Sequence, residues 1–226
     1  MNKFVCIISV ILLTACTTTP QPQPPTSLKD RVLHHYSYDN WHQVTGLAFD
    51  FNVALPNGRE VSRAWVWHVD EQIAILNPAD PDAITIDLTQ AEFDEDTRRA
   101  HGRFINDTYW LLYPFYLEWG QPQITEQPAN LDDPNTPNRL IATHTTGGYT
   151  PGDTYELDLN PEGQITAWTF VRNDNRRPAT WEHHIDAGPI RLALDHHGPN
   201  NFRLHFTNVR IRLQGEQDWH FLPDPE

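Results

Sequence analysis

The sequence predicts a mainly β domain of the α+β class: a curved antiparallel sheet that forms an incomplete barrel and is covered by a few short helices. Three observations support this fold class. About ten segments alternate apolar and polar residues with period two, as half-buried strands do. Turn sequences separate these segments at short intervals, and the regular helical crossovers that parallel strands require are missing. We therefore expect antiparallel neighbours in meander order.

Residues 1–15 are expected to be a lipoprotein signal peptide. Lys3 precedes an apolar run at residues 4–13 that is too short to span a bilayer as a helix. The run ends in LTAC at residues 13–16, which resembles the bacterial lipobox. This resemblance implies that Cys16 carries several acyl chains, such as palmitate, which together give stable anchoring. Thr17, in place of Asp, implies the outer membrane of a Gram-negative cell, with the domain facing the periplasm.

Residues 16–27 predict a lipidated Cys followed by a Pro-rich tether, and residues 28–226 a single β-rich half-barrel domain. The chain has two cysteines, and Cys6 leaves with the signal peptide. The mature domain is therefore expected to lack disulfides, thiolate metal sites and Cys nucleophiles. The formal net charge of -14 argues against nucleic acid as a partner and against a basic face on an anionic membrane.

The first half of the domain begins with a short amphipathic helix over residues 28–36, where Leu28, Val32 and Tyr36 are four residues apart. Residues 47–69 then predict a hairpin of two long strands, because apolar residues alternate on both sides of Asn57-Gly58. Residues 72–76 and 84–88 predict further strands.

A helix is expected next, because Thr89 and Glu92 fit a Thr-x-x-Glu capping box that would start a helix running to about Gly102. A dense aromatic block, FINDTYWLLYPFYLEW, follows at residues 104–119. We expect Asn106 or Asp107 to cap a short helix in this block, and Pro114 to limit the helix to the part before it. Residues 121–138 are rich in Pro, Asn, Asp and Gln and predict a long loop.

Strands return in the second half, at residues 139–145, 153–159, 164–171, 180–185, 190–195 and 202–213. NPEG at residues 160–163 predicts a turn, and Gly147-Gly148 a turn or bulge. In the last strand the apolar residues change from even to odd positions, which predicts a β-bulge near Asn208.

No catalytic motif is present, so neither an enzyme nor a cofactor is expected. The His pairs 34–35, 183–184 and 196–197 carry residue types that suit zinc or copper, and the latter two have acidic neighbours. Adjacent strand residues point to opposite faces, so a pair cannot chelate a metal alone. We assign no metal ligand and keep a periplasmic His-based metal binder as an alternative.

The aromatic block has three possible uses: core, wall of a hydrophobic ligand cavity, or direct membrane contact. Tyr and Trp have polar tips that suit a partly wet cavity edge. Asn106, Asp107 and Glu118 interrupt the block, which disfavours membrane contact. The candidate cavity residues are Trp65, Trp67, Phe104, Tyr109, Trp110, Tyr113 and Trp168.

Several phrases together resemble a family of uncharacterised bacterial outer-membrane lipoproteins related to the LolA/LolB-like lipoprotein-sorting superfamily. They are Trp41-His42, RAWVW at residues 63–67, FINDTYWLLYPFYL at 104–117, YTPGDTYELDL at 149–159 and ITAWTF at 165–170. The resemblance covers residues 38–213. It implies a curved, incomplete antiparallel barrel with a helical lid that encloses a cavity for acyl chains. No functional residue of the sorting factors can be matched to a position of this chain.

The expected function is therefore a non-enzymatic, lipid-anchored envelope protein that binds a hydrophobic ligand, either a lipid or an acylated protein. The alternative is a structural or interaction module of the cell envelope without a ligand cavity. In both cases the N-terminal lipid anchor would attach the chain to the membrane.

Overall fold

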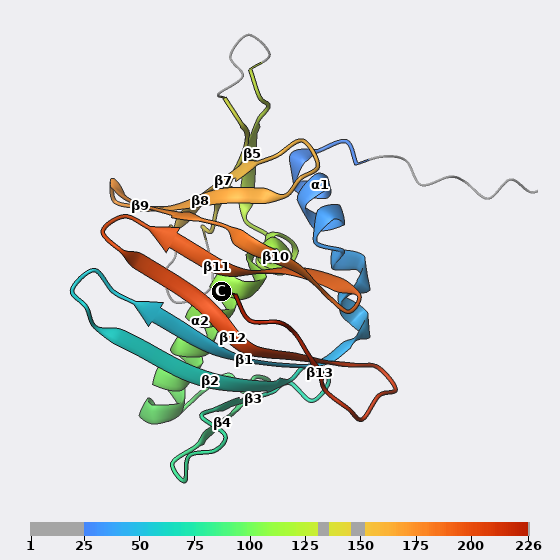
Figure 1. The fold of residues 1–226 in the computed structure, drawn as a ribbon, viewed down its shortest axis with the longest axis vertical. Helices are drawn as coiled ribbons and strands as arrows, with labels where there is room; N and C mark the ends of the chain where they lie inside the picture. The colour runs from blue at the N-terminus through green and yellow to red at the C-terminus, as the bar shows by residue number, and fades with distance from the viewer. Residues whose placement is uncertain (1–24, 131–135, 146–151, 226) are drawn as a thin grey trace, which may run out of the picture.

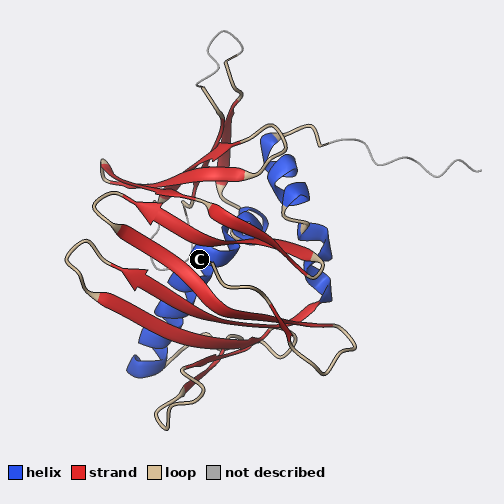
Figure 2. Ribbon diagram, viewed as in Figure 1, coloured by secondary structure: helices blue, strands red, loops and turns tan. Residues whose placement is uncertain are grey.

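The computed structural model describes residues 25–130, 136–145 and 152–225 as two antiparallel sheets with helices packed against them (Figures 1 and 2). The two sheets do not close into a barrel, which confirms the predicted fold class. The strands form two sheets where the sequence indicated one curved sheet. The lipid anchor predicted at Cys16 lies outside the described residues, and so does the turn predicted at Gly147-Gly148.

The first sheet has the order β10-β11-β12-β1-β2-β3-β4, and β13 pairs with β12. Its strands are β1 (Val44–Ala54), β2 (Glu60–His68), β3 (Ile73–Leu76), β4 (Ile84–Asp87), β10 (Glu182–Ala187), β11 (Ile190–Gly198), β12 (Phe202–Leu213) and β13 (His220–Phe221). The predicted hairpin is confirmed: β1 pairs with β2, and Gly58 adopts the positive φ of 78° that its turn requires.

The second sheet is a meander of β5 (Gln123–Gln127), β6 (Asn138–Thr143), β7 (Thr154–Leu159), β8 (Ile165–Arg172) and β9 (Asn175–Thr180). The prediction of an unbroken loop over residues 121–138 was wrong, because β5 lies there. Ile124 is the one apolar residue of β5, so this edge strand carries no alternating pattern. The strand predicted at 180–185 spans the end of β9 and the start of β10, where the chain passes from the second sheet to the first.

Two short helical segments precede the first strand. Helix α1 (Leu28–His35) is present as predicted, and the Ser27 side chain accepts a hydrogen bond from the Asp30 backbone N–H at its start. The 3-10 helix η1 (Tyr38–Gln43) connects α1 to β1.

The long helix α2 (Glu95–Trp119) differs most from the prediction, because it joins two expected segments into one helix of 25 residues. Asp94 caps its start, whereas the Thr89 hydroxyl bonds to Asp87. Pro114 does not end the helix. Leu112 instead leaves helical geometry, with φ -121° and ψ 19°, which accommodates the proline ring as a kink. Beyond the kink Tyr113, Phe115 and Leu117 are buried, and this burial stabilises the continuation.

Helix α2 passes behind the strands of the first sheet in Figure 2 and covers their inner face. Residues of one parity face it from neighbouring strands, because Phe49 lies opposite Trp65, and Trp65 opposite Leu76. All three side chains are buried. The period-two pattern of the sequence therefore defines the core face of this sheet.

The bulge predicted in the last long strand is confirmed at Asn208. The pairing of β12 with β1 shifts between Ala48–Arg210 and Asp50–Thr207, and Asn208 has a φ of 51°. The Asn208 side chain donates to Asp50 Oδ2 at 2.6 Å, and its backbone N–H donates to Asp224 Oδ1 at 2.8 Å. Because of the extra residue, apolar side chains on both sides of the bulge reach the core.

Replacing Asn208 tests how the bulge is held. We expect Asn208→Ala to lower the free energy of unfolding by about 2 kcal/mol, because Ala disfavours the left-handed region and loses the bond to Asp50. Asn208→Gly loses the same bond without backbone strain and should cost about 1 kcal/mol. Urea unfolding of both variants measures the difference, and equal losses would show that backbone strain contributes nothing.

Candidate functional site

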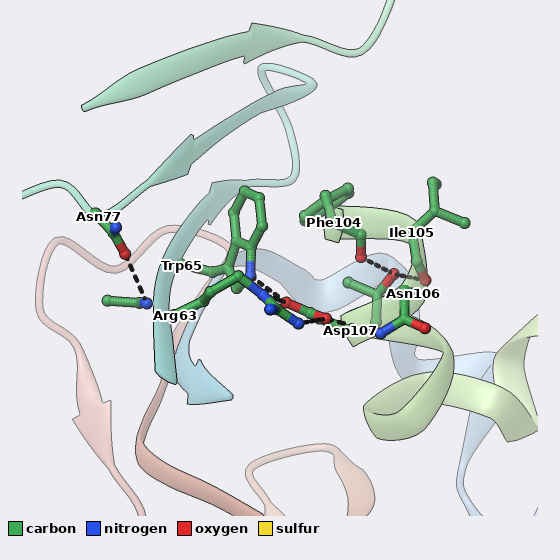
Figure 3. Close-up of polar contacts among 9 residues, drawn as sticks. Arg63, Trp65, Asn77, Phe104, Ile105, Asn106 and Asp107 are labelled. Atoms are coloured by element: carbon green, nitrogen blue, oxygen red, sulfur yellow. Dashed lines mark hydrogen bonds and ion pairs between the residues drawn. The ribbon is translucent and has the colours of Figure 1, made fainter. Parts of the chain in front are cut away.

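A buried carboxylate joins α2 to the first sheet (Figure 3). Asp107 has no exposed surface. Its Oδ2 accepts hydrogen bonds from Arg63 Nε at 2.7 Å and Trp65 Nε1 at 2.8 Å, and its Oδ1 accepts one from Arg63 Nη2 at 2.6 Å. The Arg63 guanidinium also lies 4.5 Å from the centre of the Phe51 ring. The bidentate ion pair and the hydrogen bond from the indole together fix α2 on β2.

The expectation that Asn106 or Asp107 begins a helix was wrong. Both residues lie inside α2, and Asn106 Nδ2 donates to Asp107 Oδ1 at 3.0 Å. Asp favours helix starts in isolated sequences, yet here a cation and an indole N–H from the opposite strand satisfy the carboxylate. The sequence did contain a signal of this ion pair. Arg63 lies two residues before Trp65 in RAWVW and therefore places a charge on the core face of that strand.

Three of the seven predicted cavity residues form a first aromatic group between α2 and β2. The Phe104 ring packs edge-on against both indoles, with centroids 5.3 Å from Trp65 and 5.3 Å from Trp67. All three side chains are buried. The first aromatic group lies directly beside Asp107, which holds the Trp65 indole in place.

The other four predicted residues form a second aromatic group, where α2 faces the second sheet. Trp110 and Tyr113 lie 4.3 Å and 5.3 Å from Trp168, and Tyr109 lies 5.8 Å from Tyr113. Tyr113 and Trp168 are buried, whereas Tyr109 and Trp110 are partly exposed. The second aromatic group therefore runs from the surface of α2 into the core.

His196 and Trp181 belong to the same part of the core, although neither is among the seven predicted cavity residues. The His196 ring lies 4.2 Å from Trp181 and 5.4 Å from Trp110. His196 is fully buried, and burial lowers its pKa to about 3, so the ring is neutral at pH 7. The sequence contained a signal that His196 is buried. It follows Ile190, Leu192 and Leu194 at alternate positions of β11 and so lies on the same face of the strand.

The two sheets meet beside the second aromatic group without a strand ladder between them in the described part of the chain. Two hydrogen bonds to Thr180, the last residue of β9, connect the sheets here. Its carbonyl accepts from His196 Nδ1 at 3.1 Å, and its hydroxyl accepts from the His197 backbone N–H at 2.9 Å. We call this contact between β9 and β11 the seam.

The paired histidines make separate contacts and do not converge on one point. The His184 Nε2 lies 2.9 Å from the Tyr36 hydroxyl, and burial lowers the His184 pKa to about 4. His196 is buried whereas His197 is exposed, as the alternation of a strand requires. In the ranges that the structure describes, no three His, Cys, Asp or Glu side chains gather as a metal site would need.

Two surface hollows lie away from both aromatic groups. One is lined by residues of β2, β12 and the turn after β3, including Ala64, Pro78 and Arg210. The other is lined by Thr45, Asp70, Arg212 and their neighbours. The rings of the aromatic groups pack directly on one another. Within the described residues, no helix combines the length and apolarity needed to cross a membrane.

Comparisons with known proteins give a structural likeness but no sequence relative. No protein-family model matches the chain, and no curated protein matches it. A crystal structure of a LolA superfamily protein from Nitrosomonas europaea is similar over 83% of this chain and 94% of that one, with 11% identity and a TM-score of 0.43. Similarity this low assigns neither a family nor a function to this chain.

Removing the buried carboxylate should weaken the whole fold. We expect Asp107→Ala to lower the free energy of unfolding by about 3 kcal/mol, because the mostly buried Arg63 loses its counter-charge. Replacing both partners, as Arg63→Met with Asp107→Leu, should recover most of this loss because no unpaired charge remains. Urea unfolding of the single and double variants gives the comparison. A double variant as unstable as Asp107→Ala would contradict this account.

Acid should destabilise the domain through His196. Its folded pKa of about 3 lies below the ordinary 6.5, so its contribution is present above pH 6.5 and is lost as pH falls toward 3. Between pH 6.5 and 5 the loss should be about 1.5 kcal/mol for His196. His184 acts in the same direction. Urea unfolding at the two pH values measures the loss, and His196→Phe should reduce it; an unchanged pH dependence in that variant would exclude His196.

Proposed function

We propose that this protein is a lipid-anchored envelope protein that binds a hydrophobic ligand, a lipid or the acyl chain of an acylated protein, without transforming it. The observation that carries this proposal is the second aromatic group. Its partly exposed members on α2, Tyr109 and Trp110, are continuous with the buried Tyr113 and Trp168. A ligand that displaces the outer rings would reach an apolar interior.

The seam supplies a way to open this part of the core. A strand ladder would have to lose several backbone hydrogen bonds, whereas the seam depends on the two bonds to Thr180 described above. Regions with few such bonds open at lower free energy than the sheets around them. Trp110 contacts both sheets beside the seam, through Trp168 of β8 and His196 of β11.

The proposed anchor rests on the sequence alone. The lipobox-like LTAC places the lipid on Cys16, and the Pro-rich residues 17–27 would hold the domain clear of the membrane surface. A tethered domain of this kind could accept an apolar ligand near the outer membrane. Neither a cofactor nor a catalytic residue has a role in this proposal.

A second candidate function, a structural or interaction module of the envelope, is favoured by one observation. The rings of the second aromatic group lie at contact distance from one another, with centroids 4.0 Å apart for Tyr109 and Tyr116 and 4.3 Å apart for Trp110 and Trp168. A module that never opens would keep this packing as a permanent core. The two candidates differ in whether an apolar probe enters.

Ligand binding is testable with the full-length purified protein. Native mass spectrometry after purification should show co-purified lipid, and the stripped protein should bind the apolar fluorophore N-phenyl-1-naphthylamine. We expect Trp110→Ala to weaken fluorophore binding at least about tenfold, because the indole supplies a large contact area. Phe221→Ala is the matched control, since Phe221 is an exposed aromatic residue on β13, far along the chain from α2.

Three results decide between the candidates. Loss of binding in Trp110→Ala with normal binding in Phe221→Ala supports a ligand site at the second aromatic group. Equal weakening in both variants places the fluorophore on the outer surface. Absence of both lipid and fluorophore binding in the unmodified protein favours the structural module.

A further inference from the structure

The buried rings in and beside the second aromatic group carry three polar atoms without a hydrogen-bond partner among the described residues: His196 Nε2, Trp168 Nε1 and Trp181 Nε1. Two of these rings, His196 and Trp168, contact the partly exposed Trp110. His196 has no exposed surface, and Trp168 is 2% exposed. An unmatched buried atom destabilises the fold relative to a paired one. Native proteins keep few such atoms, so three among contacting rings call for a physical explanation.

The unmatched atoms of His196 and Trp168 have opposite chemistry. The His196 Nδ1 lies 3.1 Å from the Thr180 carbonyl oxygen, which only accepts, so Nδ1 carries the proton. The Nε2 of this neutral ring then presents a lone pair and only accepts. The Trp168 indole N–H only donates. One unmatched acceptor and one unmatched donor therefore lie on the two rings that contact Trp110.

The two side chains share their neighbours. The His196 ring lies 5.4 Å from Trp110 and 4.2 Å from Trp181, and the Trp168 ring lies 4.3 Å and 5.1 Å from the same two indoles. Trp110, which contacts both rings, is partly exposed. A ligand that displaces Trp110 would therefore reach both rings.

We propose that the ligand of this site is an apolar molecule with a hydroxyl group, which donates to His196 Nε2 and accepts from Trp168 Nε1. A hydroxyl satisfies both atoms, because it is a donor and an acceptor at once. An ether or ester oxygen, a carboxylate or a phosphate diester only accepts, and an ammonium group only donates. This inference rests on the proposed function and adds the chemical class of the ligand.

A pair of isomeric probes tests the hydroxyl. 1-Decanol and 1-methoxynonane contain the same atoms, but only the alcohol can donate a hydrogen bond. We expect full-length protein to bind the alcohol about tenfold more tightly in competition with N-phenyl-1-naphthylamine, the value of one well-made buried hydrogen bond. This comparison uses the unmodified protein, so it does not depend on the folding of any variant.

Two variants then test the role of each nitrogen atom in binding. His196→Phe keeps a ring of similar size but removes the acceptor, and should abolish the preference for the alcohol. Trp168→Phe removes the N–H donor. It should weaken the binding of the alcohol and of the ether about equally, so that the preference for the alcohol remains. Circular dichroism of each variant checks that the fold is retained.

The outcomes separate this inference from the proposed function. Equal binding of both probes by the unmodified protein would overturn the proposal that the site recognises a hydroxyl group, but would leave a hydrophobic site. This result is expected if a buried water alone satisfies the two atoms. A preference that persists in His196→Phe also overturns it. If neither probe competes, the proposed function fails, and the inference with it.

Discussion

The ion pair between Asp107 and Arg63 is the constraint on which the rest of this structure depends. A fully buried carboxylate must keep its counter-charge, so only one rotation and one height of α2 over β2 are compatible with it. That placement sets every other residue of the helix by its helical spacing. Phe104, one turn before Asp107, enters between the two indoles of β2. Trp110 and Tyr113, one and two turns after it, face the second sheet instead.

The kink at Leu112 divides α2 into parts with different surroundings. The part before it is fixed on the first sheet by the ion pair, and it ends with Tyr109 and Trp110, which face the second sheet. The kink at Leu112 lies two residues after Trp110, which contacts Trp168 of the second sheet and His196 of the first. Helix α2 thus packs on the first sheet at its ion pair and on the second sheet around its kink.

Local patterns of the sequence predicted most of the fold. Alternation located the long strands, Asn57-Gly58 the first hairpin, and a change of parity the bulge at Asn208. The sequence did not reveal that α2 continues through Pro114 or that β5 exists, because burial of the last turns and pairing with β6 decide those elements. The seven aromatic residues were selected by type, and their division into two groups depends on the rotation of α2. His196 was missed because His was weighed as a metal ligand, although its parity matched the core.

The pairing of β1 with β12 has a consequence for how the chain reaches its native state. These neighbours join the beginning and the end of the domain, and the contact between Thr45 and Arg212 closes a separation of 167 residues. The central ladder of the first sheet is thus among the most non-local contacts possible in this chain, which makes its formation slow. When only the first half of the domain has left the ribosome, the central strand β1 has no partner on one side. The first sheet is therefore completed only when the last strands emerge.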